Sequence, residues 1–398
     1  METPSQSTRI NVVDCLRGFA VCGIIMIHFL EHMNFYSFPE PTALDQGIWD
    51  TVFFLGASKM YAIFALLFGF SCYIQHHNQE KKGKDFRGRF AWRMLLLFVW
   101  GMIDLFFYNG DILCTYAVIG LLLIPLVKAP DKVLVGLAIF FFLQPVEIVY
   151  EILGAANPSI PPMDLGQGPL WAALFEPCAN GSILDVGRAG LKYGLQINFG
   201  WAIENGRLTQ TYLLFIVGML LGRKRLFIDE GDHLKTWKKI LIASVVSFAV
   251  FFPLWKILPG HVANRTIAHS LDIQLNMWRN FSMMAFYVSG IVLLYYNTKA
   301  QNAIARLAAI GKMSLTDYLL QSIIGGFLFY NWGLGLYRVC GHTMSFCLSI
   351  AFLFLLYFFC KWWTSRHRRG PLEELWSRLT FICSKCTHSV SSVHTGEL

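Results

Sequence analysis

The chain has 398 residues, of which 55% are hydrophobic and 15% charged, and long uncharged apolar runs recur along it. This composition is typical of a polytopic α-helical membrane protein. The formal net charge of +8 lies largely in short Lys- and Arg-rich segments between the apolar runs, so it indicates membrane orientation and excludes a nucleic-acid partner. Ten cysteines in a chain of this length do not make a disulfide scaffold.

The apolar runs predict an all-α fold with ten membrane helices in one transmembrane domain that spans residues 1–398. In chain order, the predicted spans are residues 10–31, 48–75, 90–108, 112–128, 132–153, 209–223, 238–258, 274–297, 312–331 and 343–363. The lipid bilayer is therefore the first expected partner, and the expected location is a cell membrane.

Basic residues between the spans predict the orientation of the chain. Lys and Arg concentrate in the loop 76–92, around 224–237 and in the tail 364–398, whereas 32–47 contains none. The positive-inside rule places these basic segments and both termini in the cytoplasm. The segment 154–208 is then the only long external loop, and its interleaved aromatic residues favour an ordered lid or acceptor platform over a plain linker.

The first span is unusual because it contains Asp14, Arg17 and His28. Ionisable groups inside a membrane helix are costly and indicate function by default. Arg17 and His28 are eleven residues apart, which is about 1100° of helix and about 16 Å of rise, so they share one face at two depths. Asp14 lies one turn before Arg17, where its carboxylate can pair with the guanidinium. We therefore expect a buried polar track along this helix.

Residues 14–20, DCLRGFA, followed by His28, resemble the first helix of the transmembrane acyltransferase superfamily. In that superfamily, an arginine and a histidine with ten residues between them mark the acetyl-transfer site. Four further stretches resemble the YeiB-like branch, a family of bacterial membrane proteins whose domain has no assigned function. They are KMYAIFALLFG at 59–69, GDIL at 110–113 with Tyr116, GKMSLTDYLLQS at 311–322 and GPLEELW at 370–376.

The resemblance covers almost the whole chain and implies a membrane-embedded acyltransferase. Acyl-CoA in the cytoplasm, with acetyl-CoA the expected donor, would supply a sugar or glycoconjugate acceptor at the outer face of a bacterial plasma membrane. Two positions depart from the pattern of the branch: Asp104 stands where a histidine is expected, and Asp317 stands where asparagine is common. Any family role of those two positions is therefore in doubt.

The chemistry of the marked residues fits this implication. The imidazole of His28 can take a proton from an acceptor or carry an acyl group at ordinary pH. Asp111 is expected on the same external side, where it would orient His28. Arg17 is suited to bind an anionic part of CoA, and its distance from His28 is comparable to the reach of a pantetheine arm.

The remaining site predictions place Asp14 and Lys59 beside Arg17 in the donor site and Ser314, Tyr318 and Gln321 in the substrate site. Structural alternatives exist for most of the marked residues: an Asp14–Arg17 ion pair, Asp111 as a helix cap, Lys59 as a snorkelling side chain, and Tyr318 or Gln321 as interhelical hydrogen-bonding groups. No metal site is expected. The His and Cys residues that could suggest one are His76, His77, Cys383, Cys386, His388 and His394. The tail has the CxxC pair Cys383 and Cys386 but not the second CxxC that a zinc ribbon needs.

A second function class stays open: a transporter or flippase that moves a lipid-linked or amphipathic molecule without chemistry. Charges inside the membrane would also mark a transport path. An inverted repeat would favour such a carrier, but the first and last five predicted helices show no convincing one. The acceptor, the acyl group and the oligomeric state are not fixed by the sequence, and a homo-oligomer is one option.

Overall fold

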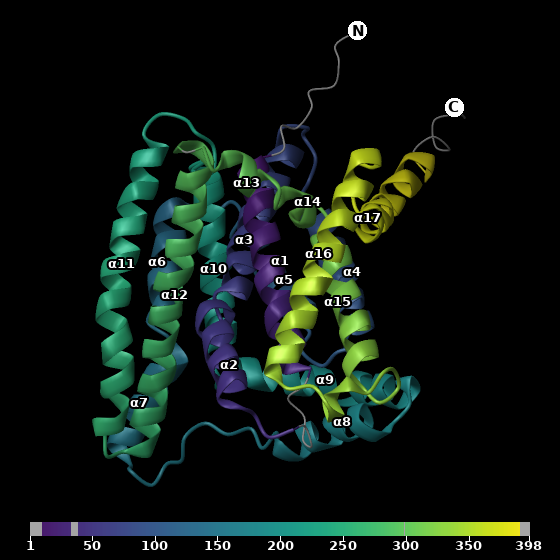
Figure 1. The fold of residues 1–398 in the computed structure, drawn as a ribbon. Coiled ribbons are helices and arrows are strands. Elements are labelled where there is room, and N and C mark those ends of the chain that lie inside the picture. Colours follow the sequence, from purple (N-terminus) through teal and green to yellow (C-terminus); the bar gives the residue numbers. More distant parts are fainter. Residues whose placement is uncertain (1–9, 33–38, 298, 391–398) are drawn as a thin grey trace, which may run out of the picture.

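The structure is a computed structural model that describes residues 10–32, 39–297 and 299–390, without the side chains of residues 297 and 382–390. All regular structure in these ranges is helical, and they contain no strand. Figure 1 shows a bundle whose longer helices run side by side, with α8 and α9 lying across one end. The prediction of an all-α fold is confirmed for this part of the chain.

The helices of the described residues follow one another with short connections. In order they are α1 (Asn11–Glu31), α2 (Ala43–Gly56), α3 (Met60–Glu80), α4 (Arg87–Leu105), α5 (Leu113–Leu121), α6 (Asp131–Phe142), α7 (Pro145–Ala156), α8 (Gly168–Asn180), α9 (Ile183–Glu204), α10 (Arg207–Arg223), α11 (His233–Ile257), η1 (Pro259–His261), α12 (Arg265–Asn297), α13 (Gln301–Ala305), α14 (Ala308–Gly311), α15 (Ser314–Phe329), η2 (Leu336–Arg338), α16 (His342–Arg366) and α17 (Pro371–Val390).

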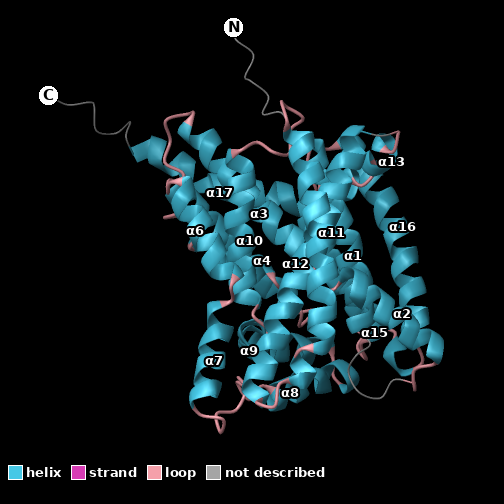
Figure 2. Cartoon of the chain, turned by 90° about the vertical axis from the view of Figure 1, so that its left-hand side faces the viewer, coloured by secondary structure: helices cyan, strands magenta, loops and turns pink. Residues whose placement is uncertain are grey.

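The two ends of the bundle differ in their charge. We name them the α17 end, where α1 begins, and the α8–α9 end, where α1 finishes (Figures 1 and 2). The Lys- and Arg-rich turns after α3, α10 and α16 all lie at the α17 end. This clustering is what the positive-inside rule requires if the α17 end faces the cytoplasm. The cytoplasmic placement of both termini stays a prediction.

Several helices are long and apolar enough to cross a membrane. Within the described residues, four stretches meet this test alone, and six do so if two bent helix pairs each count as one span. The four are Asn11–Glu31, Ala43–Glu80, His233–His261 and His342–Arg366. The protein is therefore a helical membrane protein. The count of ten spans stays a prediction, although each of the ten predicted ranges overlaps a helix.

Two predicted spans are interrupted by residues with a left-handed backbone. The span 48–75 is divided into α2 and α3 near Ser58, whose φ is 71°. The span 132–153 is divided into α6 and α7, with a bend of 45° at Gln144, whose φ is 57°. Pro145 follows Gln144 and cannot donate a backbone hydrogen bond. The Gln144 side chain instead binds the start of α10, accepting from Thr209 Oγ1 and donating to the Gly206 carbonyl.

The centre of the bundle contains α3 and α10, which run parallel at close range. A Cβ on Gly69 would lie 1.9 Å from the carbonyl oxygen of Phe215, and one on Gly218 would lie 2.0 Å from that of Leu66. Only glycine permits this approach, and small residues are a common device for packing membrane helices without a hydrophobic driving force. The two helices therefore begin at a shared depth and hold their first residues side by side.

The segment 154–208 is largely helical. Ser182 and Asp185 form a capping box at the start of α9, with the Ser182 side chain accepting from the backbone of Asp185. Helix α9 then packs on α4, where a Cβ on Gly190 would lie 1.9 Å from the Leu105 carbonyl oxygen. Its Asn198 donates to the carbonyl oxygen of Asp111 at 3.0 Å. The segment is thus ordered and attached to the bundle, whereas its external location and its role as a lid or acceptor platform stay predictions.

Candidate active site

Arg17 lies inside the bundle between α1 and α3. Its Nη1 donates to Oδ1 of the buried Asp14 at 3.2 Å, and its Nη2 donates to the Ser71 hydroxyl on α3. The predicted Asp14–Arg17 pair is therefore present. The pair lowers the cost of carrying both charges into the membrane, and the second contact fixes the guanidinium against the neighbouring helix.

Helix α14 crosses α1 at the level of Arg17. A Cβ on Gly18 would lie 2.0 Å from the Leu307 carbonyl oxygen, and a Cβ on Gly311 would lie 1.8 Å from that of Asp14. The two glycines thus allow backbone-to-backbone contact, which explains their place in two of the motifs. The contact brings Lys312, the residue after Gly311, to the same cavity as Arg17.

A cavity of about 390 Å³ begins beside these residues. Four cations line it: Arg17, Arg93, Lys312 and Arg369. Most of the other lining residues are apolar, and three are tyrosines. The apolar residues are Ile24, Phe64, Leu67, Phe68, Phe90, Met94, Leu97, Ile112, Leu113, Leu315 and Trp376, and the tyrosines are Tyr61, Tyr116 and Tyr318. The cavity therefore combines a group of positive charges with a long apolar wall.

Helix α17 closes one side of this cavity. Glu373 accepts from the backbone N–H groups of Leu315 and Thr316 at 2.7 and 3.1 Å, and from the Thr316 hydroxyl at 2.6 Å. The carboxylate thus satisfies the free N–H groups at the start of α15, which has no side-chain cap of its own. Two separate motifs, 311–322 and 370–376, therefore meet in one contact. The tail 364–398 contains this docked helix.

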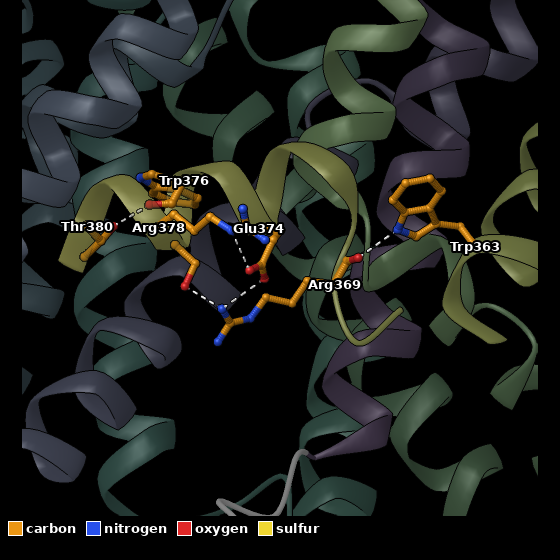
Figure 3. Close-up of polar contacts among 7 residues, drawn as sticks. Trp363, Arg369, Glu374, Trp376, Arg378 and Thr380 are labelled. Carbon is orange, nitrogen blue, oxygen red and sulfur yellow. Dashed lines mark hydrogen bonds and ion pairs between the residues drawn. The ribbon is translucent and has the colours of Figure 1, made fainter. Parts of the chain in front are cut away.

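Ion pairs stiffen the turn that leads into α17 (Figure 3). Arg369 contacts Glu374 at 3.5 Å and the Ser377 hydroxyl, while its backbone carbonyl accepts from Trp363 Nε1 at 2.8 Å. Arg378 donates to the other Glu374 oxygen at 3.0 Å. This hydrogen bond, together with the charge of Arg369, holds the pKa of Glu374 below its ordinary value. Glu374 is therefore ionised at neutral pH and keeps Arg369 at the cavity.

His28 lies in a group of aromatic rings deeper in the bundle. Its ring centroid is 4.8 Å from that of Tyr108, 6.0 Å from that of Tyr318 and 6.5 Å from that of His32. Its Nδ1 is buried without a hydrogen-bond partner among the described residues. Tyr108 stacks on His32 at 4.2 Å and donates to Glu31 at 2.9 Å. Tyr318 also lines the cavity, so one lining residue lies next to the imidazole of His28.

Asp111 caps the start of α5. Its two oxygens accept from the backbone N–H groups of Leu113 and Cys114, each at 2.9 Å. The next residue, Ile112, donates its N–H to the Tyr318 hydroxyl at 3.2 Å. In the part of the chain that the structure describes, no hydrogen bond joins Asp111 to His28. Tyr318 thus contacts both His28 and the backbone next to Asp111, and a direct catalytic role for Asp111 stays a prediction.

The other predicted site residues divide between the cavity and its surroundings. Ser314 and Tyr318 line the cavity. Gln321 is buried one turn beyond Tyr318, and neither amide atom has a hydrogen-bond partner among the described residues. The following turn of α15 reaches His32, since a Cβ on Gly325 would lie 2.9 Å from its Nε2. Lys59 is not a lining residue and instead donates to the Phe54 carbonyl oxygen at 2.6 Å.

The two positions that depart from the family pattern are fully buried. Asp104 receives no well-formed hydrogen bond, although the Ser322 hydroxyl is near. Asp317 accepts from Cys360 Sγ at 3.4 Å. No metal cluster of His, Cys, Asp or Glu occurs in the described ranges. Of the predicted metal-site candidates in the tail, Cys383, Cys386 and His388 have undescribed side chains, and His394 lies outside the described residues.

Sequence reasoning missed several residues of the site. Glu31 and His32 follow His28 by three and four positions, so helical spacing alone places them on its face. Arg93, Arg369 and Tyr108 carry no such signal because they come from other segments. Their place depends on how α4 and α17 pack against α1 and α15.

Known proteins resemble this chain over most of its length. It is 27% identical to the uncharacterized protein YxaH of Bacillus subtilis (strain 168) over 402 aligned residues. The alignment covers 94% of this chain and 94% of YxaH. It is 25% identical to the uncharacterized protein YeiB of Escherichia coli (strain K12) over 397 aligned residues. That alignment covers 92% of this chain and 95% of YeiB. A family described as a protein of unknown function (DUF418) matches residues 221–382. The chain is therefore similar over most of its length to YeiB and YxaH, and over residues 221–382 to this family of unknown function.

A second family match covers the first part of the chain. The catalytic region described as heparan-alpha-glucosaminide N-acetyltransferase matches residues 9–160. That range holds Arg17, His28 and Asp111, whereas the range 221–382 holds Tyr318 and Glu373. The cavity is therefore lined by residues from both matched segments.

Proposed function

We propose that this protein is a membrane-embedded acyltransferase that moves an acyl group, acetyl in the first instance, from acyl-CoA to a hydroxyl or amine of a sugar or glycoconjugate. One observation carries the proposal: a cavity lined by four cations and a long apolar wall reaches Tyr318, whose ring lies 6.0 Å from that of His28. The similarity of residues 9–160 to an acetyltransferase catalytic region supports the same reaction class.

The shape of the cavity suits an acyl-CoA donor. Its phosphates would be held by Arg17 and the neighbouring cations at the α17 end, since guanidinium groups bind phosphate through paired N–H donors. The pantetheine arm would follow the apolar wall. The thioester would then lie between Tyr318 and His28, with the buried Gln321 amide one turn away and available to donate to the carbonyl oxygen.

The transfer needs one base. His28 takes the proton from the acceptor O–H or N–H as the acceptor atom attacks the thioester carbonyl. The new acyl bond forms, the C–S bond breaks, and the CoA sulfur leaves with the electron pair. The resulting imidazolium returns its proton to that sulfur or to water. Glu31, held by Tyr108 next to His28, supplies a negative charge close to the imidazolium.

Labelled donor tests this proposal. Purified protein incubated with acetyl-CoA carrying a radiolabelled acetyl group should label either itself or an added sugar acceptor, and the label should depend on His28. Binding of acetyl-CoA with no transfer to any acceptor, joined to vectorial movement of an amphipathic cargo in proteoliposomes, would favour the carrier alternative.

We propose a bacterial plasma membrane as the location, with the α17 end in the cytoplasm where acyl-CoA is made. The clustering of basic turns at that end supports this orientation. A cysteine introduced at Lys82 should resist an impermeant thiol reagent in intact cells, whereas one at Lys192 on α9 should react. The background is a variant from which the reactive native cysteines have been removed. Labelling at position 82 in intact cells would reverse the orientation.

A further inference from the structure

A second group of positive charges lies outside the cavity. Lys59 precedes α3, Arg207 begins α10, and Arg279 lies within α12. The positive charges of Arg207 and Arg279 both repel the Lys59 ammonium, and the charge of Arg207 also repels that of Arg279. The parallel packing of α3 and α10 explains the closeness of the first two, because each opens its helix at the same depth. We call these three residues the cation cluster.

The hydrogen-bond partners of the cation cluster are all neutral. Lys59 donates to the Phe54 carbonyl oxygen. Arg207 donates to Gln210 at 3.2 Å and to the Ser58 hydroxyl. Arg279 donates to side-chain oxygens of Asn276 and Asn280 at 2.7 and 3.3 Å. In the described ranges no carboxylate lies within ion-pair distance of any of the three, although the charge of Glu31 is felt at Arg207 and that of Asp272 at Arg279.

Burial makes this arrangement costly without a ligand. Lys59 is 1% exposed and Arg279 is 7% exposed. Among the described residues, the Nε atoms of Arg207 and Arg279 and the Nε2 atom of Gln210 are buried without a hydrogen-bond partner. Buried charges in proteins are normally paired, and a charge removed from water without a counter-ion is strongly unfavourable. Three mutually repelling cations, with unpaired donors on two of them and on Gln210, therefore call for an anion.

The cation cluster is connected to the catalytic group. The Arg207 guanidinium stacks on the Tyr61 ring at 4.9 Å. Tyr61 lines the cavity together with Tyr318, the neighbour of His28. An anion at the cluster would thus lie behind a tyrosine that lines the cavity.

We propose that the cation cluster holds the anionic group of the acceptor, and that this acceptor is a phosphate-bearing polyol with a free hydroxyl. This inference rests on the proposed acyl transfer and names the class of its second substrate. Phosphate fits because the cluster combines two guanidinium groups, an ammonium and an amide donor. The same chemistry occurs in a free glycerol phosphate and in the headgroup of phosphatidylglycerol.

Binding can be measured without catalysis. The full chain in phosphatidylcholine nanodiscs should bind radiolabelled glycerol 3-phosphate, and unlabelled glycerol should not compete. Arg207→Gln and Arg279→Gln should each weaken binding at least tenfold, whereas Arg279→Lys should retain part of it. Lys192→Gln is the matched control, because Lys192 is an exposed cation that stacks on Tyr193; it should bind like the wild type. All variants should keep the acetyl-CoA affinity of the wild type within about twofold, which reports an intact fold.

A second binding experiment, with a lipid, distinguishes a free phosphate ester from a lipid headgroup as the ligand. Fluorescent phosphatidylglycerol should be retained over phosphatidylcholine by the wild type and lost by Arg207→Gln if the ligand is a headgroup. The inference is overturned if neither probe binds, if glycerol competes as well as glycerol 3-phosphate, or if the Arg207 and Arg279 variants with normal acetyl-CoA binding keep full affinity. Normal binding of both substrates without acyl transfer would instead contradict the proposed function alone.

Discussion

Helices α1 and α11 are both long and apolar, yet they occupy opposite environments. In the most apolar window of each, 72% of the residues of α1 are buried inside the protein, against 6% for the stretch that begins with α11. Helix α1 carries Asp14, Arg17 and His28, whereas α11 has no charge from Ile240 to Pro253. Apolarity alone therefore marks a membrane helix, and the few ionisable residues mark the one that the bundle surrounds.

Removing the imidazole from α1 should have the largest effect. We expect His28→Ala to lower acyl transfer by about 10² to 10⁴-fold, because it removes the only proposed acid–base group. His269→Ala on the peripheral α12, whose residue is exposed, should leave the rate unchanged. The rate of label transfer at saturating acetyl-CoA measures both, and equal rates for the two variants would remove His28 from the mechanism.

Asp111→Asn should lower the same rate by less than His28→Ala. The two changes should also be non-additive, because both groups act through the arrangement at Tyr318. A double variant whose loss equals the product of the two single losses would separate Asp111 from the catalytic group.

A larger residue in the contact between α1 and α14 should destabilise the fold. Gly311→Ala places a Cβ 1.8 Å from the Asp14 carbonyl oxygen, so α14 must move, at a cost of about 1–3 kcal/mol in the free energy of unfolding. Gly290→Ala in α12 meets no atom within 4 Å and should be neutral or stabilise by up to about 1 kcal/mol. Thermal unfolding in detergent reads out both, and a stable Gly311→Ala protein would contradict the backbone contact.

Removal of a positive charge should weaken acetyl-CoA binding when the charge lies on α1 but not when it lies on α11. Arg17→Ala should raise the acetyl-CoA Kd about tenfold, since a hydrogen bond to a charged group contributes about 1.5–3 kcal/mol. Arg17→Lys should recover only part, because it loses the paired donors. Lys238→Ala on α11 removes an exposed cation at the same end of the bundle and should leave the Kd unchanged. Calorimetry on all three proteins would test this, and an unaltered Kd in Arg17→Ala would place the donor elsewhere.

The smallest effect is expected at helix starts. Helix α15 begins inside the bundle on the Glu373 carboxylate, whereas α11 begins at the surface after Asp232 without a side-chain cap. Glu373→Gln keeps one acceptor but loses its charge, so we expect a loss of about 1 kcal/mol in stability. Asp232→Asn should change stability by less than about 0.5 kcal/mol, because its pair with Lys235 is exposed. Equal melting temperatures for the two variants would indicate that α15 does not depend on α17.

The helices were largely predictable from the sequence, because a membrane interior demands long apolar runs. The breaks at Ser58 and Gln144 were not, since the surrounding residues stay apolar and a left-handed backbone is stabilised by contacts from elsewhere, such as Thr209 with Gln144. The helical content of 154–208 had a local signal in the Ser182–Asp185 capping box.

The site was predictable only where its residues share a helix. Arg17 and His28 follow from spacing along α1, and Ser314 and Tyr318 follow from a motif on α15. Arg93 and the cation cluster depend on packing between segments far apart in the chain, which one sequence does not reveal. The Lys59 position illustrates the difference: its residue type suggested a role, but the structure was needed to associate it with Arg207 and Arg279.

The capping of α15 by Glu373 has a consequence for biogenesis. A membrane protein is inserted from its N-terminus as it is synthesised, so α15 enters the bilayer before its cap exists. The start of α15 acquires its acceptor only when residue 373 has left the ribosome and α17 has docked. A protein truncated before Gly370 would lack the cap and one wall of the cavity, whereas one truncated after Phe381 would keep every described contact of α17. Helix α17, the last of the described helices to be synthesised, thus completes the wall of the cavity.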